Sequence, residues 1–233
     1  MKRVAFYTLG CKVNQYETEA MSEIFEKSGY TVCDFEDFAD IYVINTCTVT
    51  SMSDRKSRQI IRRAKKINEN AYIIVTGCYA QVARDEVAKI EGVNLVLGAK
   101  ERDKIVELAD RHFEEPFFSE SSDISHTHGF EPLEIGEFKS RTRAYIKVQE
   151  GCNQFCSYCI IPYARGPIRS RDISDVIAET KRLAGAGFTE VTYVGIHIAS
   201  YGLDGKNYDL ADLLCKADNI EGIRRIRLSS IDL

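Results

Sequence analysis

The sequence lacks any apolar run of the roughly 18 to 20 residues that a membrane-spanning helix requires. Its longest apolar stretches, such as 71–76, have the length of a strand. It also lacks a strong charge of one sign, because the formal net charge is −4. Contact with a polyanion would therefore depend on local clusters of basic residues. These absences argue against a membrane span and indicate a globular chain.

A complete export signal is also missing. The start MKRVAFYTLGC has a basic tip and a Leu-Gly-Cys sequence similar to a bacterial lipoprotein signal, but its apolar region is short and is interrupted by Tyr7 and Thr8. We therefore expect a cytoplasmic chain with no membrane partner. The eight cysteines should then be reduced thiols, which favours metal ligation or thiol chemistry over disulfides.

Short apolar segments alternate with helix-length segments over residues 1–112. The expected strands cover 4–9, 41–46, 71–76 and 93–97, and the expected helices cover 14–28, 51–68, 80–90 and 102–112. The strand segments are rich in Val, Ile and Tyr, as buried parallel strands are. The alternation predicts an α/β fold in which residues 1–112 form a doubly wound parallel sheet domain.

The periodicity is lost over 113–140, a stretch rich in Glu, Ser, His, Pro and Gly that we interpret as a linker. A second series follows over 141–233. Its expected strands cover 144–151, 190–197 and 223–230, and its expected helices cover 174–184, with Ser174 as N-cap, and 210–217. Because this series is too short to close a barrel, we expect the first part only of a partial (β/α) barrel.

The segment GCNQFCSYC places Cys152, Cys156 and Cys159 in C-x3-C-x2-C spacing directly after an expected strand. Three thiolates on one loop can ligate three irons of a [4Fe–4S] cluster and leave the fourth iron open to an outside ligand. A structural zinc site would need a fourth ligand from elsewhere, such as His197. The spacing therefore predicts an iron–sulfur cluster.

The wider segment GCNQFCSYCIIPYARGPIRSR resembles the radical S-adenosylmethionine (SAM) methylthiotransferases. Besides the glycine and cysteines, the matching residues are Pro162, Arg165, Gly166, Ser170 and Arg171. The resemblance implies that the open iron binds SAM through its amino and carboxylate groups. It also implies that an electron donor such as flavodoxin or ferredoxin reduces the cluster, which then cleaves SAM to a 5′-deoxyadenosyl radical, and that a second SAM supplies a methyl group.

Three further cysteines, Cys11, Cys47 and Cys78, each follow an expected strand, in LGC, NTC and TGC. The C-terminal ends of parallel strands lie along one sheet edge, so these cysteines can converge there. From the residues alone they could equally be small core residues. The resemblance implies a second [4Fe–4S] cluster here, which presents the sulfur to be transferred. Cys33 and Cys215 have no counterpart in the pattern, and we interpret both as structural residues in apolar surroundings.

Two residues are candidates for SAM binding. The resemblance places Tyr158 where the family contacts the adenine of SAM, although an aromatic side chain here could also form a lid over the cluster. Gly195 lies toward the end of an expected strand, at the position where radical SAM proteins bring backbone close to the methionine amino group, and a glycine permits that approach. Alternatively, Gly195 only bends the strand.

The segments GIHIASYG and RIRLSSID resemble the members that modify threonylcarbamoyladenosine, whereas the isopentenyladenosine enzymes usually have an asparagine in place of His197. The predicted reaction is therefore methylthiolation of carbon 2 of N6-threonylcarbamoyladenosine at position 37 of a tRNA. Alternatives are isopentenyladenosine in tRNA, an aspartate of a ribosomal protein, and a non-enzymatic iron–sulfur or zinc protein.

Two basic segments could contact the RNA. The expected helix 51–68 carries Arg55, Lys56, Arg58, Arg62, Arg63, Lys65 and Lys66, which suits a phosphate backbone but also suits a solvated helix face. Arg165, Arg169 and Arg171 follow the cysteine loop and could pair with phosphate or with the SAM carboxylate. Members of this family usually continue into further barrel strands and a small RNA-binding β-domain, so turnover by this chain alone is not assumed.

Overall fold

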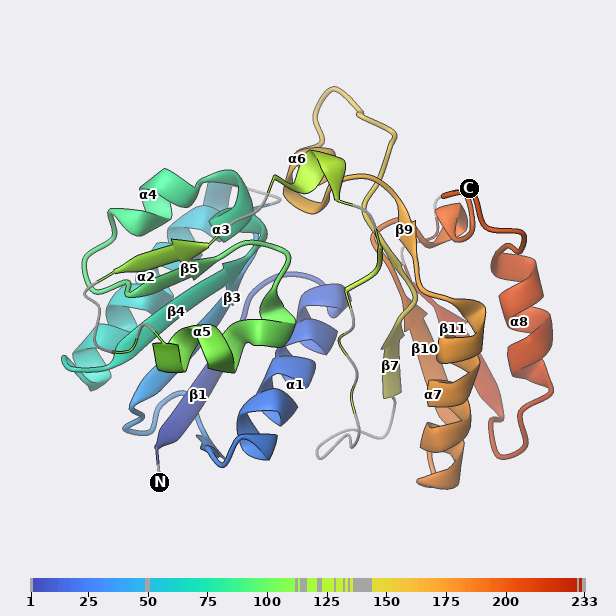
Figure 1. Cartoon of the computed structure of the whole chain (residues 1–233), viewed down its shortest axis with the longest axis horizontal. Coiled ribbons are helices and arrows are strands. Elements are labelled where there is room, and N and C mark those ends of the chain that lie inside the picture. Colours follow the sequence, from blue (N-terminus) through green and yellow to red (C-terminus); the bar gives the residue numbers. More distant parts are fainter. Residues whose placement is uncertain are drawn as a thin grey trace. The chain divides into compact units, whose positions relative to one another are not determined.

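The computed structural model describes residues 2–48, 51–111, 113, 117–120, 123–127, 129–131, 133, 135, 144–229 and 231. The chain divides into two compact units. Unit 1 comprises Met1–Ile124 and Glu131–Ile135, and unit 2 comprises Ser125–Phe130 and Gly136–Leu233. Each unit contains a parallel sheet flanked by helices (Figure 1). The predicted α/β class is therefore confirmed, whereas the predicted domain boundaries stay predictions.

The sheet of unit 1 has six strands in the order β2-β1-β3-β4-β5-β6, and every neighbouring pair is parallel. Its strands are β1 (Arg3–Thr8), β2 (Thr31–Cys33), β3 (Ile41–Thr46), β4 (Tyr72–Gly77), β5 (Leu95–Leu97) and β6 (Phe118–Glu120). Every side chain of the central strands β3 and β4 is buried. Such strands show the continuous apolar runs by which the sequence predicted them.

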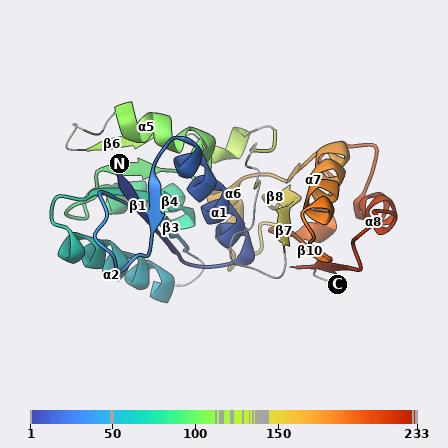
Figure 2. The ribbon, with the colours of Figure 1, turned by 90° about the horizontal axis from the view of Figure 1, so that it is seen from below.

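Helices cover both faces of this sheet. The described helices of unit 1 are α1 (Lys12–Lys27), α2 (Ser51–Ile67), α3 (Cys78–Val82), α4 (Arg84–Ala88), the short 3₁₀ helix η1 (Arg102–Lys104) and α5 (Ile105–Arg111). One core joins α2, α3 and α4 to one face, and a second core joins α1 and α5 to the other, as the arrangement in Figure 2 shows. No helix in the described residues is both long and apolar enough to cross a bilayer.

The two edge strands of unit 1 differ from the sequence expectation. Both β2 and β6 are three residues long, and a strand this short carries no recognisable alternation. β6 lies inside the segment 113–140 that we interpret as a linker, yet it pairs with β5 and so extends the sheet of unit 1. The expected helix 80–90 is also divided, because Ala83 leaves helical geometry between α3 and α4.

Unit 2 contains a parallel sheet in the order β11-β10-β7 and a small antiparallel pair, β8-β9. The strands are β7 (Ala144–Lys147), β8 (Gln149–Glu150), β9 (Arg169–Ser170), β10 (Glu190–Val194) and β11 (Arg225–Leu228). The helices are α6 (Ile161–Arg165), α7 (Ile173–Gly185), the 3₁₀ helix η3 (Ile198–Ser200) and α8 (Leu210–Asp218), and the 3₁₀ helix η2 (Ile124–His126) spans the sequence boundary between the units. One apolar core joins α7 and α8 to the sheet.

Two details of unit 2 correct the sequence expectation. The expected strand 144–151 is two strands in different sheets, because the chain turns at Val148 from β7 into β8. Helix α7 begins at Ile173 and has Asp172, not Ser174, at its N-cap. The Asp172 carboxylate accepts hydrogen bonds from Lys206 Nζ at 2.7 Å and Tyr208 Oη at 2.9 Å, and these bonds hold the pKa of Asp172 below its ordinary value.

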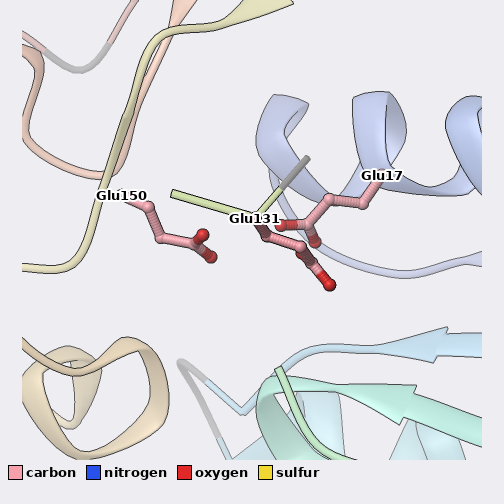
Figure 3. Close-up of side chains that lie close together, drawn as sticks. All are labelled: Glu17, Glu131 and Glu150. Atoms are coloured by element: carbon pink, nitrogen blue, oxygen red, sulfur yellow. The ribbon is translucent and has the colours of Figure 1, made fainter. Parts of the chain in front are cut away.

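A buried arginine ties two distant segments of unit 1 together. Arg102 is fully buried, and its guanidinium lies 2.5 Å from a carboxylate oxygen of Glu17 on α1 and 2.5 Å from one of Glu131. Figure 3 shows the Glu17 and Glu131 side chains. Tyr16 Oη also donates to the carbonyl of Leu133 at 2.7 Å. These bonds join Glu131, through Arg102, and Leu133 to α1.

We predict that Arg102→Met destabilises unit 1 by about 3–5 kcal/mol, because removal of the guanidinium leaves two buried carboxylates without their cation. Urea unfolding of the purified chain measures this change. Arg111→Met is the matched control, since its ion pair with Glu107 is exposed on α5 and should cost less than about 0.5 kcal/mol. Equal stability losses in the two variants would contradict the proposed tie.

Candidate functional site

The register of the unit 1 sheet brings the ends of three neighbouring strands to one edge. Thr46, the last residue of β3, is the register partner of Gly77, the last residue of β4. Cys47 and Cys78 follow these two residues directly, and Cys11 stands three residues beyond the end of the neighbouring strand β1. Because adjacent strands lie about 4.8 Å apart, the three cysteine-bearing turns are neighbours.

Two glycines allow these turns to pack closely. Gly10 has φ +104°, and a Cβ on it would lie 2.9 Å from Cys47 Sγ. Gly77 has φ +93°, and a Cβ on it would lie 2.4 Å from the carbonyl oxygen of Thr46. A side chain at either position would be strained by its backbone angle as well as by contact. The turns therefore place backbone directly against the buried sulfur of Cys47.

Exposure differs among the three cysteines of unit 1. Cys11 is exposed at the N-cap of α1, whereas Cys47 and Cys78 are buried. The Cys11 thiol points toward Asn14, with Sγ 3.6 Å from Oδ1. Asn14 and Asn45 are buried polar residues at this edge that the sequence analysis missed. In the sequence, only their closeness to the cysteines could have indicated them. Asn14 follows Cys11 by three residues, and Asn45 is the first residue of NTC.

In unit 2 the cysteine loop runs from the end of β8 to α6. Cys152 is buried, Cys159 is half-buried and Cys156 is exposed. The backbone N–H of Cys159 donates to the carbonyl of Cys156 at 2.9 Å, and that of Cys152 donates to the carbonyl of Gly166 at 3.0 Å. The loop is thus closed on itself and fastened at its start to the end of α6.

A glycine fixes the entrance of this loop. Gly151 has φ +74°, and a Cβ on it would lie 1.8 Å from the carbonyl oxygen of Pro167. Further along, Phe155 also adopts a left-handed φ of +46°, which is rare for a bulky side chain. Its ring meets that of Tyr163 edge-on at 5.8 Å between centroids. Both rings are exposed, so the loop presents an aromatic pair to solvent.

The chemistry of these two cysteine sets fits a cluster. All eight cysteines are free thiols, so each of the six is available as a ligand. Among the described residues, neither set has its three sulfurs within 4.8 Å of one another. A single tetrahedral zinc ion with 2.3 Å bonds would need sulfurs about 3.8 Å apart. Neither set has the spacing of a single zinc site, and three thiolates are a donor set that a [4Fe–4S] cluster takes.

The SAM-contact predictions for Tyr158 and Gly195 stay predictions. Tyr158 is 90% exposed, so in this structure it does not cover the loop as the alternative lid would. A Cβ on Gly195 would lie 2.9 Å from Gln149 Oε1, which also accepts the backbone N–H of His197 at 2.8 Å. Gln149 Nε2 in turn donates to the carbonyl of Gly151 at 2.7 Å. Gly195 thus packs against a side chain that braces the cysteine loop.

The two roles considered for the arginines after the loop, phosphate binding and SAM carboxylate binding, do not match their placement. Arg165 is fully buried and pairs with Glu150 at 2.7 Å. Arg169 is buried beside the same carboxylate at 3.4 Å, and Arg171 pairs with the buried Glu179. Because a buried guanidinium needs its carboxylate partner, we correct both assignments. These arginines support the loop from within.

Helix α2 carries the basic surface that the sequence predicted. A hollow along it is lined by five basic side chains, by Gln59 and Ile60, and by no acidic residue. Arg63 pairs with Glu36 at 2.5 Å, and Arg58 donates to Tyr79 Oη at 2.8 Å. No ion pair in the described part of the chain uses the remaining lining cations, which are Arg55, Arg62 and Lys66.

The two cysteines outside the sets have different surroundings. Cys33 lies on β2, donates to the carbonyl of Val4 with Sγ 3.6 Å away, and packs against the unit 1 core. Burial raises the pKa of its thiol, which suits the structural role predicted for it. Cys215 is exposed on α8, so the expectation of apolar surroundings was wrong there. Its helix buries Leu213 and Ala217 instead.

Comparisons with known proteins match the two halves of the chain separately. Residues 3–98 match the model described as Uncharacterized protein family UPF0004, and residues 146–233 match that of the Radical SAM superfamily. The chain is 50% identical, over 100% of its length, to the threonylcarbamoyladenosine tRNA methylthiotransferase MtaB of Bacillus subtilis (strain 168), and 43% identical, over 99%, to that of Aquifex aeolicus (strain VF5). It spans only 52% and 56% of those two proteins.

A second group of relatives carries a different name. The chain is 36% identical, over 97% of its length, to the tRNA-2-methylthio-N(6)-dimethylallyladenosine synthase of Dictyoglomus thermophilum, of which it covers 52%. Among solved structures, the radical S-adenosylmethionine methyltransferase TsrM from Kitasatospora setae superposes with a TM-score of 0.55 at 15% identity, covering 93% of this chain and 50% of that one. At this identity the likeness concerns the fold alone.

We predict that Gly151→Ala destabilises unit 2 by at least about 2 kcal/mol, because a Cβ would meet backbone and the left-handed angle disfavours alanine. The same variant should lose the iron bound by unit 2 after anaerobic reconstitution. Gly185→Ala in α7 is the control, since a Cβ there meets no atom within 4 Å. Thermal unfolding and iron analysis measure both effects, and normal iron binding by the Gly151 variant would contradict the account.

Proposed function

We infer from its relatives that the chain belongs to the radical SAM methylthiotransferases, and we propose that the whole protein adds a methylthio group to carbon 2 of N6-threonylcarbamoyladenosine at position 37 of a tRNA. The names of the relatives at 50% and 43% identity support this substrate. The relative named for dimethylallyladenosine is 36% identical. Because the chain spans about half the length of these relatives, the activity is proposed for the whole protein.

The observation that carries the proposal is the presence of one cysteine set in each unit. Cys11, Cys47 and Cys78 stand beyond the ends of three neighbouring parallel strands, and Cys152, Cys156 and Cys159 stand on one loop. Each set lies in a segment matched by a different family model. A methylthio transfer needs both a radical source and a sulfur source, and two separate ligand sets can provide them.

In unit 2, Cys152, Cys156 and Cys159 would hold a [4Fe–4S] cluster that, when bound, supplies the electron for SAM cleavage. Three protein ligands leave one iron for the SAM amino and carboxylate groups. Tyr158 and Gly195 are proposed to contact SAM. The protein contributes loop rigidity, through Gln149 and the hydrogen bonds that close the loop.

In unit 1, Cys11, Cys47 and Cys78 would hold the second cluster, which presents the sulfur. Of these three ligands, Cys11 is exposed, whereas Cys47 and Cys78 are buried. An electron donor such as flavodoxin or ferredoxin is proposed to reduce the unit 2 cluster. The tRNA is the proposed macromolecular partner.

We predict that the wild-type chain, reconstituted anaerobically, holds about eight irons and that Cys156→Ala holds about four, because each set binds one cubane. Iron and sulfide analysis with electron paramagnetic resonance measures this. Cys215→Ala is the control, since that exposed thiol belongs to neither set, and it should keep about eight irons. About four irons in the wild-type chain, or zinc in their place, would refute the two-cluster proposal.

The basic face of α2 leads to a second test of the proposal, directed at the tRNA partner. The triple variant Arg55→Glu, Arg62→Glu and Lys66→Glu should bind tRNA at least tenfold more weakly, and the slope of log affinity against log salt should fall by about 2 to 3, because phosphate contacts release counterions. Filter binding at several salt concentrations measures both quantities.

The control for this test reverses the same number of charges on unit 2, at Lys181, Lys216 and Arg224, which are also exposed. It changes the net charge equally but leaves α2 intact. An equal loss of affinity in the two triple variants would show that net charge, and not the α2 surface, determines tRNA binding.

A further inference from the structure

The side chain of Asn14 connects two of the cysteine-bearing turns of unit 1. It lies in the first turn of α1 and is fully buried. Its Nδ2 donates to the carbonyl of Leu9 at 2.8 Å and to that of Thr46 at 3.0 Å. These carbonyls belong to the turn that carries Cys11 and to the residue directly before Cys47. One amide group therefore uses both of its N–H donors to join the two turns.

The joined turns are in close contact around the sulfur. A Cβ on Gly10 would lie 2.8 Å from Cys47 Cβ, 2.9 Å from Cys47 Sγ and 3.2 Å from Asn14 Nδ2. The amide of Asn14 thus lies beside the point where the Cys11 turn approaches Cys47. These two hydrogen bonds therefore add to the strand register and to this packing in fixing the separation of the turns.

A second asparagine, Asn45, holds the backbone of Asn14 in place. Asn45 on β3 is fully buried, and its Nδ2 donates to the carbonyl of Asn14 at 3.0 Å and to Thr18 Oγ1 at 3.1 Å. Within the described residues, Asn45 Oδ1 has no hydrogen-bond donor, and it lies 2.4 Å from the position that a Cβ of Gly77 would occupy. Asn45 therefore fixes the first turn of α1 and contacts the turn that precedes Cys78.

We propose that Asn14 is a positioning residue that sets the spacing of Cys11 and Cys47 before the cluster binds. This inference rests on the proposed second cluster. Burial gives the amide a fixed geometry, because a buried donor left without its acceptor costs about 1–3 kcal/mol. The ligand turns are therefore held near their working separation, and the cluster does not have to order them.

The other atom of the amide has a separate effect on Cys11. Oδ1 accepts from the Cys11 thiol, with Sγ 3.6 Å away. The same amide therefore contacts the thiol of Cys11 as well as the carbonyls of Leu9 and Thr46. A carboxylate in its place would repel both carbonyls, since it has no N–H to donate.

The test compares Asn14→Asp and Asn14→Ala in a background that carries Cys152→Ala, Cys156→Ala and Cys159→Ala, so that only the unit 1 site can bind iron. The background chain should hold about four irons with a [4Fe–4S] spectrum. Asn14→Asp should retain less than about one tenth of that iron, and Asn14→Ala an intermediate amount with an altered electron paramagnetic resonance signal, in keeping with lost preorganisation.

Asn68→Asp is the matched control. Asn68 is buried in unit 1 and donates to the carbonyl of Ala39 at 2.8 Å, but Asn68 follows α2 and is adjacent to none of the three cysteines in sequence. It should lose thermal stability to a similar degree while keeping its iron and its spectrum. If circular dichroism shows that Asn14→Asp does not fold, the electron paramagnetic resonance spectrum of Asn14→Ala tests the positioning role instead.

The outcomes distinguish the proposed second cluster from the proposed positioning role of Asn14. No cluster in the background chain, with Asn14 intact, would contradict the proposed second cluster. A full cluster with an unchanged spectrum in both Asn14 variants would contradict the positioning role alone. Equal loss of iron in the Asn68 control and in the Asn14 variants would show that general stability, and not the tie between the turns, determines cluster binding.

Discussion

The structure of unit 1 depends on one constraint, the in-register parallel pairing of β1, β3 and β4. Parallel pairing sends every strand end to the same edge, and register decides which residues emerge side by side. Here it brings three cysteines, 31 or more residues apart in the sequence, to neighbouring turns. The glycines and asparagines at this edge then determine how closely those turns pack.

Unit 2 brings its three cysteines together in a different way. Its three cysteines come from one loop, so sequence spacing and not sheet register sets their separation. Lys147, Arg165 and Arg169 pair with the buried carboxylate of Glu150, the residue just before Gly151. Loss of one partner from such a network would leave a buried charge without its counter-charge, which is destabilising. The network therefore stabilises the start of the loop.

Sequence patterns predicted the fold class, the central strands and the strand-end positions of the cysteines, because each follows from local periodicity. They missed β2 and β6, since three-residue edge strands have no periodicity of their own and are stabilised by pairing with neighbours. They also misjudged Arg165 and Arg171, because no local signal shows that an arginine has a buried carboxylate partner. The contacts of Asn14 arise only when α1 and β3 come together.

The central proposal is that both cysteine sets serve one reaction on tRNA. The most direct measurement is mass spectrometry of tRNA nucleosides from cells that lack the full-length gene and carry either the intact gene or one with Cys47→Ala. We predict that N6-threonylcarbamoyladenosine lacks its methylthio group in the deletion strain and in the Cys47 strain, and regains it with the intact gene. N6-threonylcarbamoyladenosine that still carries the methylthio group in the Cys47 strain would contradict the proposal.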